Sequence, residues 1–241
     1  MILPGASIVP HLPLIEDLTK EPVPSGFNIL VEFDPTSEWY YSSITMAAGW
    51  LKSGGIVAYN TTLHPPSKIR SQFALLGLTP ETLEKEGRLE IWDWYTLTLG
   101  QKPTEALTVD SLKVQDLSII FGRLMKRQLG GPAANVLAIM DNYSSIARFN
   151  DERAWVEFML TRNVPSGRSI GCVIDAIIRE LHSEWVYKNL EAAYDGVVDF
   201  KLEETGEGTR SLIRIRSMRN IHFDRRWHEL NADQSFDVTL K

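Results

Sequence analysis

The clearest arrangement for chemistry lies in the segment FDPTSEWY, from Phe33 to Tyr40. An apolar stretch precedes it, an amphipathic stretch follows it, and Gly54-Gly55 then leads into a second apolar stretch. A strand, a short turn and a helix in this order surround a phosphate-binding loop, because the first N–H groups of the helix face the anion. This segment has that layout but contains neither glycine nor lysine. Its residues are Phe33, Asp34, Pro35, Thr36, Ser37, Glu38, Trp39 and Tyr40.

The same residues predict an ordinary helix start. Thr36 or Ser37 can cap a helix, and Glu38 suits the first turn, where a carboxylate interacts favourably with the helix dipole. Trp39 and Tyr40 carry large rings that fill volume well, so we expect them to pack inside the protein rather than stack on a nucleobase.

Three further residues could do chemistry, and each also has a structural interpretation. Asp141 ends the apolar run NVLAIM, where it could help hold magnesium or simply form a turn. His64 could act as a base, although a histidine before Pro-Pro is more often a surface residue. Cys172 lies in the apolar run SIGCVIDAII, which predicts a buried thiol rather than a nucleophile.

The elements that must position these residues alternate along the chain. Apolar strands separated by amphipathic helices predict an α/β domain with a mainly parallel, doubly covered sheet. The predicted strands are 27–33, 56–59, 89–94, 135–140 and 169–174. The predicted helices are one from about Thr36 to Ser53, then 66–76, 111–128, 151–160 and 183–193.

The two ends of the chain differ from this pattern. Residues 1–25 are rich in proline and predict an extended arm. Near the other end, two alternating strands flank the turn at 204–209, which predicts a β-hairpin. No linker divides the rest, so we expect a single domain over 26–241.

Composition narrows the function classes. The 241 residues carry a net charge of −6, which argues against a general nucleic-acid or membrane binder. No apolar run approaches the ~20 residues of a membrane span. The single cysteine argues against a disulfide framework, and the N-terminal sequence does not resemble a signal peptide, so we expect a cytoplasmic protein. A local cluster of basic residues still occurs near the C-terminus. It comprises Arg210, Arg214, Arg216, Arg219, Arg225 and Arg226.

Several segments together resemble the RecA-like ATPase superfamily, specifically its KaiC/RadA-like branch. PVPSGFNILVEF is similar to the start of that domain, and GWLKSGGIVAYNTT to the end of its first helix and its second strand. AAYDGVVDFKLEE and TRSLIRIRSMRNIH resemble its hairpin, which ends in a Lys-Met-Arg-Gly turn. The resemblance covers about residues 8–241 and implies a RecA-like three-layer domain with a C-terminal β-hairpin extension.

The resemblance places the family's phosphate loop, Gly-x-x-Gly-x-Gly-Lys-Thr, on Phe33 to Tyr40 without insertion or deletion. Phe33, Thr36 and Glu38 then replace the glycines. Trp39 replaces the lysine, and Tyr40 replaces the hydroxyl that binds magnesium. Residues with a Cβ do not freely adopt positive φ, and without lysine the phosphates lose their main counter-charge. The resemblance therefore implies a degenerate phosphate loop.

The family's other site positions divide into lost and retained residues. Leu63 and His64 stand where the catalytic acidic pair is expected. Asp141 stands at the Walker B position. Met218 and Arg219 match the turn that reaches a neighbouring subunit's nucleotide, although Ser217 and Asn220 replace its lysine and glycine.

The resulting hypothesis is a pseudo-ATPase that acts as an assembly, scaffold or regulatory subunit. We expect it to form an oligomer with itself or with RecA/KaiC-like subunits, with no catalytic residues, no metal and no cofactor. One alternative is an ATP-binding or ATP-hydrolysing KaiC-like signalling or recombinase-like protein that uses Asp141, Arg219, ATP and magnesium. Another is a DNA-binding paralogue, but the basic residues near 142–153 and 163–168 are interleaved with acidic ones, so nucleic acid is not the expected partner.

Overall fold

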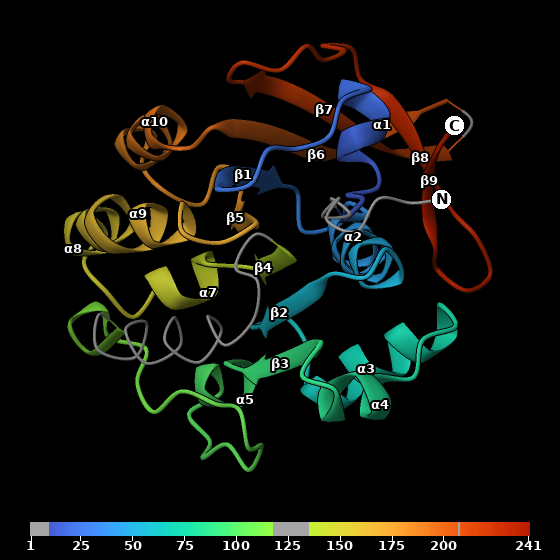
Figure 1. The fold of residues 1–241 in the computed structure, drawn as a ribbon. Coiled ribbons are helices and arrows are strands. Elements are labelled where there is room, and N and C mark those ends of the chain that lie inside the picture. Colours follow the sequence, from blue (N-terminus) through green and yellow to red (C-terminus); the bar gives the residue numbers. More distant parts are fainter. Residues whose placement is uncertain (1–9, 118–134, 207) are drawn as a thin grey trace.

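The computed structural model describes residues 10–117, 135–206 and 208–241. Its described strands form one sheet in the order β3-β2-β4-β5-β1-β6-β7-β8-β9 (Figure 1). The pairs from β3 to β6 are parallel and those from β6 to β9 are antiparallel. The strands are β1 (Phe27–Phe33), β2 (Ile56–Thr61), β3 (Leu89–Asp93), β4 (Val136–Met140), β5 (Cys172–Ile178), β6 (Gly196–Thr205), β7 (Gly208–Met218), β8 (His228–Ala232) and β9 (Val238–Leu240).

Helices cover both faces of the parallel part, which gives the predicted three-layer α/β fold (Figure 1). One face carries α1 (Ile15–Thr19), α2 (Trp39–Lys52), α3 (Pro66–Leu75) and α4 (Pro80–Lys85). The other carries α5 (Tyr95–Thr98), α7 (Ser144–Ala147), α8 (Glu152–Phe158), a π-helical turn (Met159–Asn163), α9 (Val164–Gly167) and α10 (Glu184–Ala193).

Strand β1 lies between β5 and β6 and is buried along its whole length. Because successive side chains of a strand point to opposite faces, β1 contributes to two separate cores. Ile29 and Val31 pack with α2 and α3, whereas Leu30 packs with α8 and α10. This double burial explains why the strand is almost continuously apolar in sequence.

Some predicted boundaries were wrong. The fifth strand runs over Cys172–Ile178, not 169–174, and continues through the buried Asp175. The helix predicted over 151–160 ends at Phe158 and continues as a π-helical turn. Neither Thr36 nor Ser37 caps α2, because the Ser37 hydroxyl instead donates to the carbonyl of Asp34 (2.7 Å). Most of the helix predicted over 111–128 lies outside the described residues.

The described part of the predicted N-terminal arm is not extended throughout. It contains α1, whose Ile15 and Leu18 are buried against the core on the α2 side. Pro13 lies directly against α2, since a Cβ added at Gly49 would stand 2.2 Å from the Pro13 ring. This segment is therefore packed as part of the domain.

At the other end, the predicted hairpin is present as β6 and β7, which join where Thr205 pairs with Gly208. Two strands that the sequence interpretation missed, β8 and β9, extend the sheet beyond it. Within residues 10–117, 135–206 and 208–241, no helix is long and apolar enough to cross a membrane.

Candidate functional site

The carboxyl ends of β1, β2 and β4 bring most of the predicted site residues together. The segment 33–40 follows β1 and leads into α2, while Asp141 follows β4. Trp39 Nε1 donates to the carbonyl oxygen of Asp141 (2.8 Å). The ring of Tyr40 packs edge-on against that of His64, with centroids 4.3 Å apart. Residues that are distant in sequence thus form one contiguous group.

Asp141 is fully buried, and its carboxylate accepts four hydrogen bonds from the end of β2 and the loop after it. Oδ1 accepts from the backbone N–H and the hydroxyl of Thr62, both at 2.8 Å. Oδ2 accepts from the Thr61 hydroxyl (3.1 Å) and the Leu63 N–H (3.3 Å). Burial raises the pKa of Asp141 to about 6, against the opposing effect of the hydrogen bonds from Thr62, Leu63 and Thr61.

Polar groups at the start of α2 also form hydrogen bonds with other parts of the chain. The Glu38 N–H donates to the hydroxyl of Ser211 on β7 (2.9 Å), and the Ser37 N–H donates to the Asp34 carbonyl (2.9 Å). The Asp34 carboxylate accepts from the Leu202 N–H on β6 (3.3 Å). Strands β6 and β7 therefore supply partners for the turn, of which only Pro35 and Thr36 are exposed.

Aromatic rings fill the space next to this helix start. Trp39 is buried between Phe33 and Phe200, with ring centroids at 6.0 and 5.2 Å. Tyr41 stacks nearly parallel on Phe236 near the C-terminus, at 4.6 Å. Trp39 is therefore packed inside the protein as predicted, whereas the rings of Tyr40 and Tyr41 are only partly buried.

The loop after β2 has no acidic pair among the described residues. Leu63 contributes only its N–H to Asp141, and His64 lies half-buried beside Lys68, with Nε2 3.3 Å from Nζ. Burial, aided by the charge of Lys68, lowers the pKa of His64 below its usual value. His64 is therefore a neutral, packed histidine at neutral pH.

Met218 and Arg219 lie at the other end of the strands, away from the carboxyl ends of β1, β2 and β4. Met218 pairs with Gly196, the first residue of β6, and is buried. Arg219 is half exposed and donates to the Ala192 carbonyl (2.5 Å), with Asp195 at 3.6 Å. The fold does not bring these two residues to Asp141 within one chain. Asn220 has φ 58°, a left-handed conformation that glycine adopts freely and asparagine tolerates.

Comparison with known proteins identifies the architecture. No family model and no curated protein matches the sequence. The structure is similar to that of a KaiC-like protein from the hyperthermophilic archaeon Pyrococcus horikoshii OT3, with a TM-score of 0.73 and 18% sequence identity. The match covers 96% of this chain and 97% of the other. The fold is KaiC-like.

In this KaiC-like fold, two arginines of strand β7 are engaged in ion pairs within the chain. Arg214 and Arg216 both bind the fully buried Asp199, and Arg216 also binds Glu32 (2.6 Å) and Glu191. Burial raises the pKa of Glu32 to about 7, although Arg216 opposes this. Two arginines of the predicted basic cluster therefore pair with acidic side chains of the same chain and do not form an exposed basic surface.

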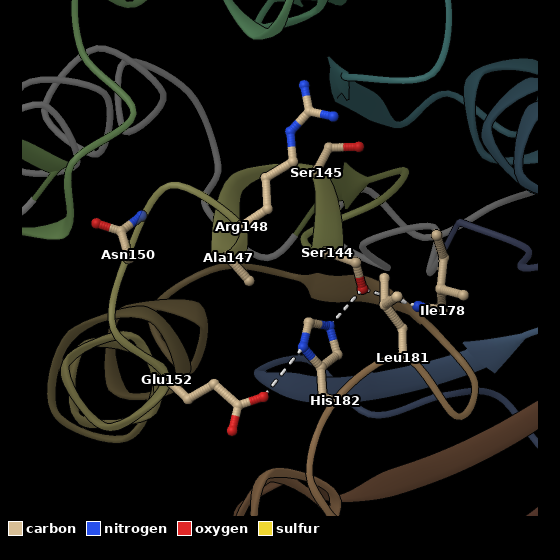
Figure 2. A pocket seen from close by; sticks show the side chains of 9 residues that line it. All are labelled: Ser144, Ser145, Ala147, Arg148, Asn150, Glu152, Ile178, Leu181 and His182. Atoms are coloured by element: carbon tan, nitrogen blue, oxygen red, sulfur yellow. Dashed lines mark hydrogen bonds and ion pairs between the residues drawn. The ribbon is translucent and has the colours of Figure 1, made fainter.

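The sequence interpretation missed two clusters in this KaiC-like fold. One is a buried network in which the carboxylate of Asp175 accepts from Asn163 and Tyr194, both at 2.6 Å. The other joins Ser144 to His182 at the ends of β4 and β5 (Figure 2). Strand-end positions of a parallel sheet are common sites of chemistry, and that position was the only signal available for Ser144. Cys172 is buried as predicted, and burial raises the pKa of its thiol.

Proposed function

We propose that this chain is a catalytically degenerate KaiC-like subunit that works through assembly and protein contacts rather than ATP turnover. The observation that carries the proposal is the Asp141 carboxylate, which is buried and accepts four hydrogen bonds from Thr61, Thr62 and Leu63. A carboxylate paired in this way has its lone pairs directed at groups of the chain and has little capacity left for a metal ion.

The segment 33–40 fits a nucleotide phosphate poorly. A phosphate loop turns several N–H groups inward and adds a lysine, whereas this turn contains neither glycine nor lysine. The Glu38 N–H is already bonded to Ser211, and the carboxylate of Glu38 would repel an anion at the helix start. Trp39 brings an indole to the position where the resemblance places lysine.

The carboxyl ends of β1, β2 and β4, where Asp141 and Tyr40 lie, also fit magnesium poorly. Magnesium prefers octahedral oxygen ligands and reaches proteins through one or two carboxylates together with substrate phosphates. Burial raises the pKa of the Tyr40 phenol, so it stays protonated and is a poor ligand. No group of three or more acidic, histidine or cysteine residues able to hold a metal occurs in the described parts of the chain.

The competing function is an ATP-binding KaiC-like protein with an atypical loop. It is supported by the position of Asp141 at the end of β4, where the resemblance places the Walker B carboxylate. This alternative requires binding energy from residues other than glycine and lysine of the loop. The two functions predict opposite results in a nucleotide titration.

Calorimetric titration with Mg-ATP separates the two. We expect no saturable heat, and sub-micromolar binding or ATP turnover that Asp141→Asn abolishes would overturn the proposal. Asp141→Asn is preferable to Asp141→Ala because it keeps acceptor capacity for some of the neighbouring donors. Sedimentation velocity over a wide concentration range tests the second half of the proposal, which predicts self-association or association with a second KaiC-like subunit.

A further inference from the structure

A pocket of about 470 Å³ opens beside α7, where β4 and β5 end. Ala147, Ile178 and Leu181 supply apolar surface, and the polar groups come from Ser144, Ser145, Arg148, Asn150, Glu152 and His182 (Figure 2). A concave space of this size with a few convergent polar groups is typical of a small-molecule site. The hydroxyl and the imidazole lie on the segments that follow two neighbouring parallel strands, so the rigid sheet fixes their separation.

Ser144 and His182 are hydrogen-bonded. The Ser144 Oγ lies 2.7 Å from His182 Nε2 and also accepts the Ile178 N–H at 2.9 Å. Since Oγ accepts the Ile178 N–H, we assign the hydroxyl proton to the bond with Nε2, which is the tautomer that this geometry suits. His182 then carries its own proton on Nδ1, which faces Glu152 Oε1 at 3.6 Å. Hydroxyl, imidazole and carboxylate thus stand in the order of an activated nucleophile, its base and the group that orients the base.

The imidazole is held in place and in its basic form. Its ring packs between Trp155 and Tyr187, with centroids 5.1 and 6.1 Å away. The Tyr187 hydroxyl accepts from the N–H groups of Leu181 and His182 and donates to the Ile178 carbonyl, which fixes the loop after β5. Burial lowers the pKa of His182, with Glu152 opposing this, so the ring is neutral at pH 7.

We propose that Ser144 is a nucleophile that takes the acyl group from short carboxylic esters, with His182 as general base and Glu152 as the positioning residue. Oγ attacks the carbonyl carbon while its proton moves to His182 Nε2. The C–O bond to the alcohol breaks, and that proton passes to the departing oxygen. Water then attacks the acyl-serine, giving one proton through His182 to Oγ and releasing the carboxylic acid. This activity is independent of the degenerate ATPase site.

The neighbouring Ser145 provides a matched comparison. It lines the same pocket, but its hydroxyl accepts a hydrogen bond from the Asn142 side chain (2.9 Å) rather than pairing with an imidazole. A serine without a base within reach has ordinary, low reactivity. Reactivity at Ser144 and not at Ser145 is therefore specific to the proposed arrangement.

The test treats the full chain with p-nitrophenyl acetate and, separately, with a fluorophosphonate, which forms an O–P bond to the serine and releases fluoride. Peptide mass spectrometry locates each adduct. We expect both adducts at Ser144 and none at Ser145, with His182→Gln slowing labelling by about 100-fold or more. An unlabelled Ser144 in the wild-type chain overturns the proposal without reliance on any variant. So does equal labelling in a folded His182→Gln protein.

Discussion

Trp39 Nε1 donates a 2.8 Å hydrogen bond to the carbonyl oxygen of Asp141, and both residues are buried. This bond joins the start of α2 to the end of β4 at the edge where the resemblance places a nucleotide. The indole of Trp39 is also packed by Phe33 and Phe200, so it is held by ring contacts as well as by this hydrogen bond. The side chain of Trp39 therefore connects the start of α2 with the end of β4.

Removal of that ring should destabilise the fold strongly. Trp39→Ala removes a fully packed indole and leaves the Asp141 carbonyl without this partner, so we expect a loss of about 3–5 kcal/mol in the free energy of unfolding. Urea unfolding followed by circular dichroism measures it. Trp185→Ala is the control, because Trp185 is 46% exposed and its loss should cost less than about 1 kcal/mol. Similar losses in both variants would show that the buried indole of Trp39 contributes no more to stability than an exposed one.

The order of β1 to β5, of the β6–β7 hairpin and of several longer helices was predictable from sequence because apolar periodicity reports burial directly, whereas the short strands β8 and β9 were missed. The chemistry of the individual positions was less accessible. The fifth strand was predicted to stop at Ile174, one residue before Asp175, but the strand continues through that buried carboxylate because Asn163 and Tyr194, 12 and 19 residues away, pair with it. Ser144 and His182 carry no mutual sequence signal, because only the sheet places their segments side by side.

The carboxyl group of Asp141 should make the free energy of unfolding decrease as the pH rises. Its pKa rises from 3.8 to about 6 on folding, so the native state binds more protons than the unfolded state between these values. Its contribution to stability is therefore largest below pH 4 and is lost as the pH rises through 6. Relative to Asp141→Asn, the wild-type chain should lose roughly 2–3 kcal/mol over this interval. Parallel urea unfolding of both proteins at several pH values measures the difference, and a constant difference would refute the assignment.

Assembly should depend on Arg219 more than on other exposed arginines. Its guanidinium is half exposed beside Asp195 at the other end of the strands from Asp141, where it is available to a second subunit. If it contributes to an interface, Arg219→Ala should weaken self-association by about tenfold or more, as measured by sedimentation velocity. Arg226→Ala is the matched control, because Arg226 is highly exposed and pairs with the nearby Asp224. Equal association constants for the two variants would show that Arg219 does not contribute to the interface.

The reactivity of Ser144 should follow the titration of His182. The base acts only when neutral, so the labelling rate should rise with pH and reach half its plateau below the usual histidine value of 6.5, since burial lowers the pKa of this ring. Glu152 favours the protonated imidazole, so Glu152→Gln should move the midpoint to lower pH while the weaker orientation reduces the plateau. Fluorophosphonate labelling rates measured from pH 5 to 8 give both quantities. A midpoint that moves upward in Glu152→Gln, or a rate that does not vary with pH, would contradict the assigned roles.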